Sequence, residues 1–210
     1  MDRPEWIPRA VPLETVYLDV GFLVSKDFYY GPENDFTPEQ YQGLRNPLYQ
    51  PQLKRYGDFV LSEAIESSAA ELIRYYQDVL LHIDRYHKNV KQQGSYFWMR
   101  PILYSSGVFA GASPWYDTWE EATSLLVALT STEEGEVFWD YDQGWQFEVF
   151  AEADRIYLRD SDPDYGEERY VIAVDRSNLA AQASEVRRRG SRVLQELVAG
   201  IGRDFWTRGL

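Results

Sequence analysis

Acidic side chains are the functional groups that cluster most strongly in this sequence. Thirteen acidic residues lie between Glu133 and Glu168 and only two basic residues, Arg155 and Arg159, so this segment contributes −11 of the total net charge of −13. The acids are Glu133, Glu134, Glu136, Asp140, Asp142, Glu148, Glu152, Asp154, Asp160, Asp162, Asp164, Glu167 and Glu168. Such a surface can attract and orient a basic protein. It can also serve solubility alone, and both interpretations stay open at this point.

The acidic segment DSDPDYGEE suggests a calcium site, because hard cations prefer clustered oxygen ligands. An EF-hand loop starting at Asp160 needs Gly at its sixth position and Glu at its twelfth, but Tyr165 and Val171 stand there. A hairpin turn rich in Asp, Pro and Gly explains the segment better. We therefore predict no metal site.

Motifs for catalysis are missing from the sequence. Cys is absent, which excludes disulfides, thiolate ligands and Cys nucleophiles together. The two histidines, His82 and His87, are five residues apart, so on a helix they point in different directions. No GxSxG, Walker or dinucleotide-binding pattern occurs. We predict no catalytic residue and no cofactor, although pairs of Asp and Glu could in principle serve a carboxylate-based hydrolase of a small polar substrate.

The first half of the chain predicts a strand, a long loop and a long helix. Apolar residues alternate over 14–24, which is typical of a half-buried strand. Residues 29–57 hold four prolines and five tyrosines, among them Tyr41 and Tyr49, and indicate a long packed loop of the kind that is often functional. Apolar steps of three and four then predict a helix over 58–87.

A β-meander is predicted over residues 136–175. A three-residue loop over 142–144 would pair Trp139 with Phe147 and leave Asp140 and Glu148 exposed on the opposite face. A two-residue loop would pair Asp140 with Phe147 instead, which mixes apolar and acidic residues on one face. We therefore expect the three-residue loop, with Trp139 and Phe147 in one core. The next turn is predicted to pair Val149 with Ile156.

A last helix is predicted over 177–199, with Ser177 as its N-cap, Gly190 as an interruption and Gly200 as its end. The whole pattern predicts an α+β protein in which an antiparallel sheet with a C-terminal meander packs against long helices. No linker or repeat separates the two halves, so we predict a single domain over residues 1–210.

Composition narrows the cellular setting and the partners. No apolar run approaches the length of a membrane helix, and the N-terminal MDRPEWIPRAVP lacks the apolar core of a secretory signal. These features fit a cytoplasmic protein that binds no membrane. The net negative charge disfavours nucleic-acid binding. Four arginines in the last helix (Arg187, Arg188, Arg189 and Arg192) could attract nucleic acid. We expect them instead to pair with the acidic meander or to lie near the C-terminal half of the helix, where positive charge is favoured.

The chain resembles the immunity proteins of bacterial polymorphic toxin systems. The resemblance lies in the motif WDYDQGWQFEVF with its acidic turns, in the helix start at Trp119, Glu120 and Glu121, and in the aromatic-rich strand over 96–104. It implies a small acidic α+β domain without cofactor that caps a secreted toxin, in some families a nuclease. It assigns a role to no individual residue.

These observations together predict an immunity protein that binds a basic toxin domain and occludes it with an acidic, aromatic-rich surface. The alternatives are the carboxylate-based hydrolase and a non-catalytic adaptor in a larger complex. The residues predicted to contact the partner are Asp140, Asp142, Glu148, Asp160, Asp162, Asp164, Tyr41 and Tyr49.

Overall fold

The computed structural model of the chain describes residues 3–32, 37–105, 109–112, 118–142 and 144–207. About 40% of the chain is helix and 32% strand, which confirms the predicted α+β class. Contacts divide the chain into two compact units. Unit 1 is Met1–Asp19, Pro101–Trp115 and Glu121–Arg188; unit 2 is Val20–Arg100, Tyr116–Glu120 and Arg189–Leu210. The single domain over 1–210 stays a prediction.

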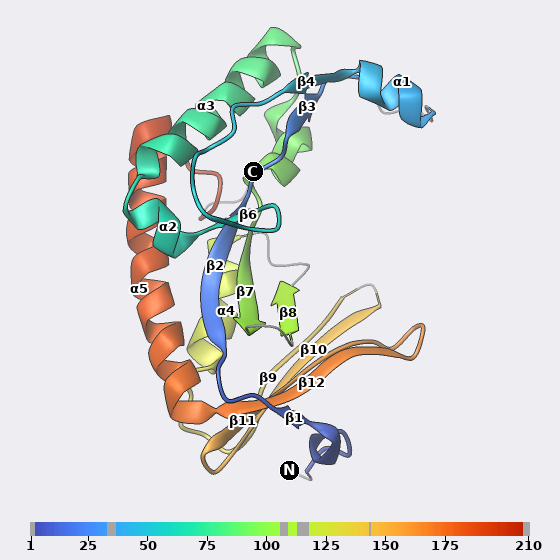
Figure 1. The fold of residues 1–210 in the computed structure, drawn as a ribbon, viewed down its shortest axis with the longest axis vertical. Coiled ribbons are helices and arrows are strands. Elements are labelled where there is room, and N and C mark those ends of the chain that lie inside the picture. Colours follow the sequence, from blue (N-terminus) through green and yellow to red (C-terminus); the bar gives the residue numbers. More distant parts are fainter. Residues whose placement is uncertain (1–2, 33–36, 106–108, 113–117, 143, 208–210) are drawn as a thin grey trace. The chain divides into compact units, whose positions relative to one another are not determined.

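Unit 1 is built around the predicted meander, which the structure confirms as four antiparallel strands (Figure 1). They are β9 (Gly135–Asp142), β10 (Trp145–Glu152), β11 (Arg155–Asp162) and β12 (Glu167–Asp175). The short β1 (Val11–Pro12) adds to β12 in parallel and follows a 3-10 helix, η1 (Ile7–Arg9), so the strand order is β1-β12-β11-β10-β9. Strand β8 (Phe109–Ala112) also lies in unit 1.

Four elements are divided between the two units. One is α4 (Trp119–Ala128), and three more belong with it. They are β2 (Tyr17–Leu23), β7 (Met99–Ser105) and α5 (Arg176–Ile201). The elements of unit 2 are β3 (Asp27–Tyr29), α1 (Pro38–Gly43), β4 (Arg45–Pro47), β5 (Arg55–Tyr56), β6 (Phe59–Leu61), α2 (Ser62–Glu66), α3 (Ala69–Arg85) and η2 (Val90–Phe97). The predicted helix over 58–87 is thus a short strand and two helices. The described residues of the predicted loop over 29–57 contain a helix and two short strands, β4 and β5.

The inner face of the meander sheet forms the core of unit 1. Phe147, Val149, Ile156 and Leu158 share this face and are buried, as predicted. A small cavity of about 20 Å³ is lined by Phe147 and Leu158 of the sheet together with side chains from helices and neighbouring strands, namely Leu18, Leu103, Leu125, Leu129 and Leu179. Helices α4 and α5 therefore supply apolar side chains to this face, and their packing fixes which side of each meander strand is buried.

The predicted register of the first hairpin is wrong by one residue. Phe147 pairs with Asp140, and Trp139 pairs with Glu148. Asp142 pairs with Trp145, and Gly144 between them adopts φ +81, in the left-handed region that favours glycine. A shift of one residue turns every side chain to the other face. Trp139 therefore lies on the outer face, and its neighbour Phe138 meets the Phe147 ring edge-on, at 6.3 Å between centroids.

The pairing across the second turn of the meander differs from its prediction by two residues. Val149 pairs with Leu158 instead of Ile156, and the turn is formed by Ala153 and Asp154. Because side chains alternate with a period of two, this shift leaves every side chain on its predicted face. The buried face of β10 and β11 was therefore predictable even though the pairing was not.

Helix α5 begins one residue before the predicted N-cap. Asp175 caps it, because its Oδ1 accepts hydrogen bonds at 2.7 Å from both the Asn178 amide and the Ser177 hydroxyl. Gly190 does not interrupt the helix. A Cβ at this position would lie 2.5 Å from Cη2 of Trp119, so glycine makes room for the indole ring.

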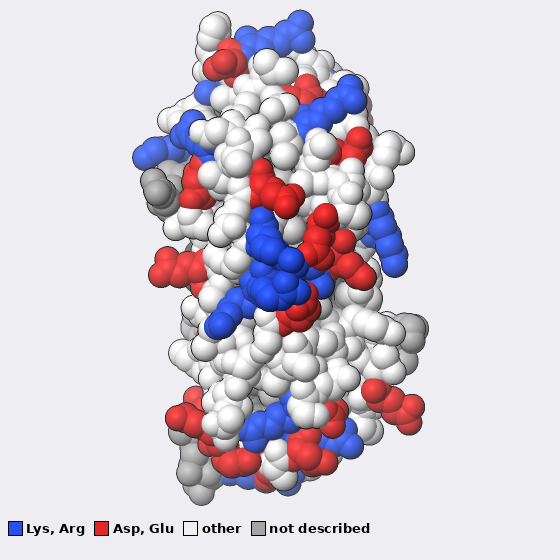
Figure 2. Space-filling view, turned by 90° about the vertical axis from the view of Figure 1, so that its left-hand side faces the viewer, with Lys and Arg blue, Asp and Glu red and all other residues white. Residues whose placement is uncertain are grey.

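Figure 2 shows basic side chains gathered on the side of the molecule that carries α5, with acidic side chains around them. Arg188 forms an ion pair with Glu185 at 2.6 Å, and Arg192 forms one with Glu66. Nε of Arg189 donates to the Ser62 hydroxyl at 2.8 Å. Three of the four arginines thus have partners within α5 or on α2, and none of these partners belongs to the meander.

Candidate protein-binding edge of the meander sheet

Strand β9 forms one edge of the meander sheet, and its residues are open to solvent. None of its eight residues is buried, whereas six of the eight residues of β10 are. Two of the large apolar side chains exposed among the described residues, Trp139 and Tyr141, lie on this strand. An exposed sheet edge is a template for pairing with another chain unless it is protected. The edge of β9 is therefore the candidate partner-binding surface of unit 1.

Trp139 and Tyr141 form a stacked pair on the outer face of β9. Trp139 is 54% exposed and Tyr141 46% exposed, and their rings lie 6.3 Å apart at an interplanar angle of 13°. Their neighbours across the hairpin are Glu148 and Gln146. Exposed Trp and Tyr are the residue types that most often anchor protein interfaces, because they bury a large apolar area with few rotatable bonds.

Acidic residues lie on the same strand as this aromatic pair and just before it. Asp142, Glu136 and Glu133 are exposed and Asp140 is half-buried. No ion pair joins any of these four side chains to the part of the chain that the structure describes. The sequence contains no Lys or Arg between Arg100 and Arg155, so β9 and its approach have no basic residue of their own.

Two of the predicted partner-binding acids are buried, which corrects the expectation that they are exposed. Glu148 is 9% exposed and Asp160 is 5% exposed. Glu148 lies on the outer face, as the alternation along β10 predicts, but Trp6 of the N-terminal segment contacts it there. Arg169 covers Asp160, and Nη1 of Arg169 donates to Oδ1 of Asp160 at 2.8 Å.

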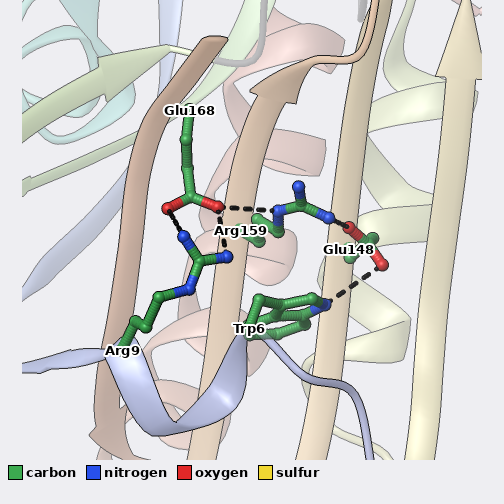
Figure 3. Close-up of polar contacts among 5 residues, drawn as sticks. All are labelled: Trp6, Arg9, Glu148, Arg159 and Glu168. Atoms are coloured by element: carbon green, nitrogen blue, oxygen red, sulfur yellow. Dashed lines mark hydrogen bonds and ion pairs between the residues drawn. The ribbon is translucent and has the colours of Figure 1, made fainter. Parts of the chain in front are cut away.

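A chain of alternating charges holds the N-terminal segment on the outer face (Figure 3). Nε1 of Trp6 donates to Glu148 at 3.2 Å, and Arg159 donates to the other oxygen of Glu148 at 2.8 Å. Nε of Arg159 also donates to Glu168 at 3.1 Å, and Arg9 binds Glu168 through two bonds of 2.9 and 3.0 Å. Trp6 packs in a cluster with Ile7, Phe150 and Val171. These acids therefore have a structural role.

Asp162 and Asp164 shape the turn between β11 and β12. Oδ1 of Asp162 accepts hydrogen bonds from the amides of Asp164 and Tyr165 at 3.2 and 3.3 Å. The turn between β9 and β10 lies beside it, since a Cβ on Gly144 would be 2.9 Å from Oδ2 of Asp164. The tips of the two hairpins thus bring Asp140, Asp142, Asp162 and Asp164 into one region. In the described residues no group of three acids or histidines is arranged to hold a metal ion.

Tyr41 and Tyr49 belong to unit 2 and are half-buried. The Tyr41 ring lies 5.3 Å from that of Tyr29. The Tyr49 hydroxyl donates to Glu71 at 2.7 Å, and the guanidinium of Arg74 lies over the Tyr49 ring at 4.1 Å. These contacts give both tyrosines a packing role within unit 2.

The alternation of aromatic and acidic residues in Trp139-Asp140-Tyr141-Asp142 is the sequence signal for the aromatic pair. The sequence prediction placed this tryptophan in the core and did not include either aromatic residue of β9 among the binding residues. Period-two alternation places the two types on opposite faces of a strand. Only the register shows which face is covered.

Unit 2 has a polar hollow of about 460 Å³. Its wall includes the cations Lys26 and Arg45, the carboxylates Asp27 and Asp58, and the aromatic residue Tyr96. Tyr96 accepts a hydrogen bond from the Tyr29 amide at 2.8 Å, and burial raises its pKa. All residues that line the hollow belong to unit 2, whereas β9 belongs to unit 1.

Comparison with known proteins leaves the function to be inferred from this geometry. No protein-family model, no curated protein and no solved structure matches the chain. Among the described helices none is both long and apolar enough to span a bilayer.

Asp160 gives a prediction for the pH dependence of stability. Burial raises the pKa of Asp160 above its ordinary 3.8, although the hydrogen bond from Arg169 opposes this. The native state therefore holds a proton over a pH range in which the unfolded chain has lost it, and this contribution to stability is lost as pH rises through the native pKa. We expect Asp160→Asn to gain stability relative to wild type as pH rises from below 3.8 toward neutrality.

The measurement is urea unfolding of both proteins at a series of pH values. Asp142→Asn, which removes an exposed carboxylate from the neighbouring hairpin, is the matched control for the loss of one charge. A difference between Asp160→Asn and wild type that stays constant over the series, or that shrinks as pH rises, would contradict the assignment.

Proposed function

We propose that this chain is an inhibitor that binds a basic protein, and specifically a cytoplasmic immunity protein that neutralises a toxin domain by occlusion. The observation that carries the proposal is the open edge of β9, where the stacked pair Trp139 and Tyr141 lies among carboxylates that have no ion pair with the described residues. A toxin that acts on nucleic acid needs Lys and Arg to hold its substrate, and these cations suit such an edge.

The acids and the aromatic residues of β9 have different roles in this proposal. Asp140 and Asp142 act at a distance, because an attractive field raises the association rate and is screened by salt beyond about 8 Å at physiological ionic strength. Trp139 and Tyr141 act in contact, because the burial of large apolar side chains slows dissociation. Buried acids such as Glu148 contribute to the fold that presents this edge.

The polar hollow of unit 2 is the feature that supports the alternative function, a hydrolase. Asp27 and Asp58 line it together with two cations, a mixed set of groups that a small polar substrate could contact. The edge of β9 favours the binding function, because stacked aromatic residues exposed on a sheet edge serve no hydrolytic step. Asp27→Asn with Asp58→Asn separates the two functions, since only a hydrolase would depend on this pair.

The proposal predicts separable kinetic effects on binding. The test uses the product of the gene immediately upstream as the partner, with association and dissociation measured at low and at physiological salt. We expect Asp140→Lys with Asp142→Lys to lower the association rate about tenfold at low salt. We expect Trp139→Ala to raise the dissociation rate roughly 30-fold, the equivalent of about 2 kcal/mol.

The matched control for charge reversal is Glu14→Lys with Glu196→Lys, which changes the net charge equally at exposed positions that do not belong to β9. Growth supplies the functional readout: we expect the upstream product to arrest bacterial growth and this chain to restore it. An upstream product that leaves growth unchanged would refute the immunity function. Association that is independent of salt and of the double reversal would show that the acids of β9 serve solubility.

A further inference from the structure

We propose that β9 takes up an extended segment of the basic partner as a sixth strand of the meander sheet, and that this segment alternates basic and apolar residues. The inference rests on the proposed function and specifies how that edge is used. It combines the backbone of β9, the two faces of the strand and the charge of its side chains.

The backbone of β9 offers hydrogen-bonding groups on its open side. Asp142 and Trp145 close a two-residue turn and therefore form a hydrogen-bonded pair. Such pairs alternate along an antiparallel ladder. Asp140 thus also bonds to β10, whereas the N–H and C=O groups of Tyr141 and Trp139 point toward the open edge. An added strand would satisfy these groups, as in other cases of β-strand addition.

The side chains of β9 define the sequence that such a strand needs. Trp139 and Tyr141 lie on the outer face, while Asp140 and Asp142 share the inner face with Phe147. Residues that lie opposite each other on neighbouring strands share a face. Basic residues of the added strand would therefore face the two aspartates, and the apolar residues between them would cover the two aromatic rings. The complementary pattern is a period-two alternation of Lys or Arg with apolar residues.

The geometry of the hairpin limits the length of the added strand. The pairing of β9 with β10 is regular from Phe138 to Asp142, and a bulge interrupts it at Val149 and Phe150, opposite the first half of β9. Bulges twist a strand and end regular pairing. The site therefore accommodates a segment of about five residues, the length of a typical strand.

The charge of β9 selects against other occupants. A second copy of this chain that paired through β9 would place aspartates near aspartates, and like charges on neighbouring strands are destabilising. Charged edge residues of this kind commonly prevent self-association of sheets. A basic segment reverses the sign of this interaction, so the same acids that exclude a second copy attract the partner.

The test uses the full chain and a short capped peptide in which Lys and Val alternate. Its control is an isomer of the same composition with all lysines at one end. We measure amide hydrogen exchange by NMR and expect the alternating peptide to slow exchange at Trp139 and Tyr141 about tenfold near saturation, while Asp140 and Asp142 stay unchanged. The isomer should leave all four amides unchanged.

Methylated peptides test the backbone bonds without altering the protein. In an added strand every second peptide amide faces β9. N-methylation of one alternate set of valines or lysines should therefore abolish the protection, and methylation of the other set should leave it. Protection that survives both, or that the isomer produces equally, would overturn strand addition. Salt-dependent binding of both peptides without protected amides would leave the charge-based proposal standing and refute only the added strand.

Discussion

Replacing Trp206 with alanine should lower the free energy of unfolding by about 3–5 kcal/mol, the range for a fully buried large aromatic residue. Trp206 is completely buried in unit 2 although it lies near the end of the chain. Its indole contacts the rings of Phe22, Tyr76, Phe97 and Phe205 at centroid distances between 5.2 and 6.3 Å. The loss of the indole would leave a cavity among rigid rings that cannot collapse to fill it.

The chain provides a matched control for this substitution. Trp139→Ala removes the same atoms from a position that is 54% exposed, and we expect the free energy of unfolding to change by less than about 0.5 kcal/mol. Urea unfolding followed by circular dichroism measures both variants. Equal destabilisation by the two substitutions would contradict the division between a core tryptophan and a surface tryptophan on which the binding proposal depends.

Replacing Arg159 with leucine should destabilise the protein by about 3 kcal/mol, because it leaves the largely buried carboxylate of Glu148 without its cation. The Glu148 side chain is 12% exposed, and among its hydrogen bonds with described side chains it would keep only the one from Trp6. Glu168 would still be held by Arg9. The cost therefore arises mainly from the one carboxylate that water cannot reach well enough to solvate.

A second substitution separates the effect of charge from the effect of packing. Arg159→Leu with Glu148→Leu removes both charges, and we expect it to recover most of the lost stability, since apolar residues often replace a buried ion pair at little cost. Unfolding in urea at neutral pH again provides the measurement. If the double variant is as unstable as Arg159→Leu alone, the ion pair is not the source of the stability.

Local periodicity was enough to predict the secondary structure of the meander and of the last helix. The alternation around Phe147, Val149, Ile156 and Leu158 identified the buried face of two strands, because period two is a local property of the extended chain. The apolar stripe of α5 was equally visible. The helix over 58–87 was predicted as one piece because a short strand before a helix can continue its apolar pattern.

The tertiary structure decided the register of the first hairpin. The sequence permits a loop of two or three residues, and the choice moves Trp139 from the core to the surface. The packing of Phe138 against Phe147 and the left-handed Gly144 accompany the shorter loop. Neither is visible in the pattern of a single strand, since both depend on what lies across the hairpin.

The clustering of acidic residues is visible in the sequence, but the role of each acidic side chain is not. Burial and ion pairs give Glu148 and Asp160 structural roles, whereas Asp140 and Asp142 remain beside solvent with no ion pair to the described residues. The cations lie on neighbouring strands, 11 positions from Glu148 and 9 from Asp160, and Trp6 reaches Glu148 from 142 positions away. The sequence alone determined the total charge and the strands that carry it. Only the fold determined which carboxylates meet an internal cation and which face water, because that depends on contacts between distant segments.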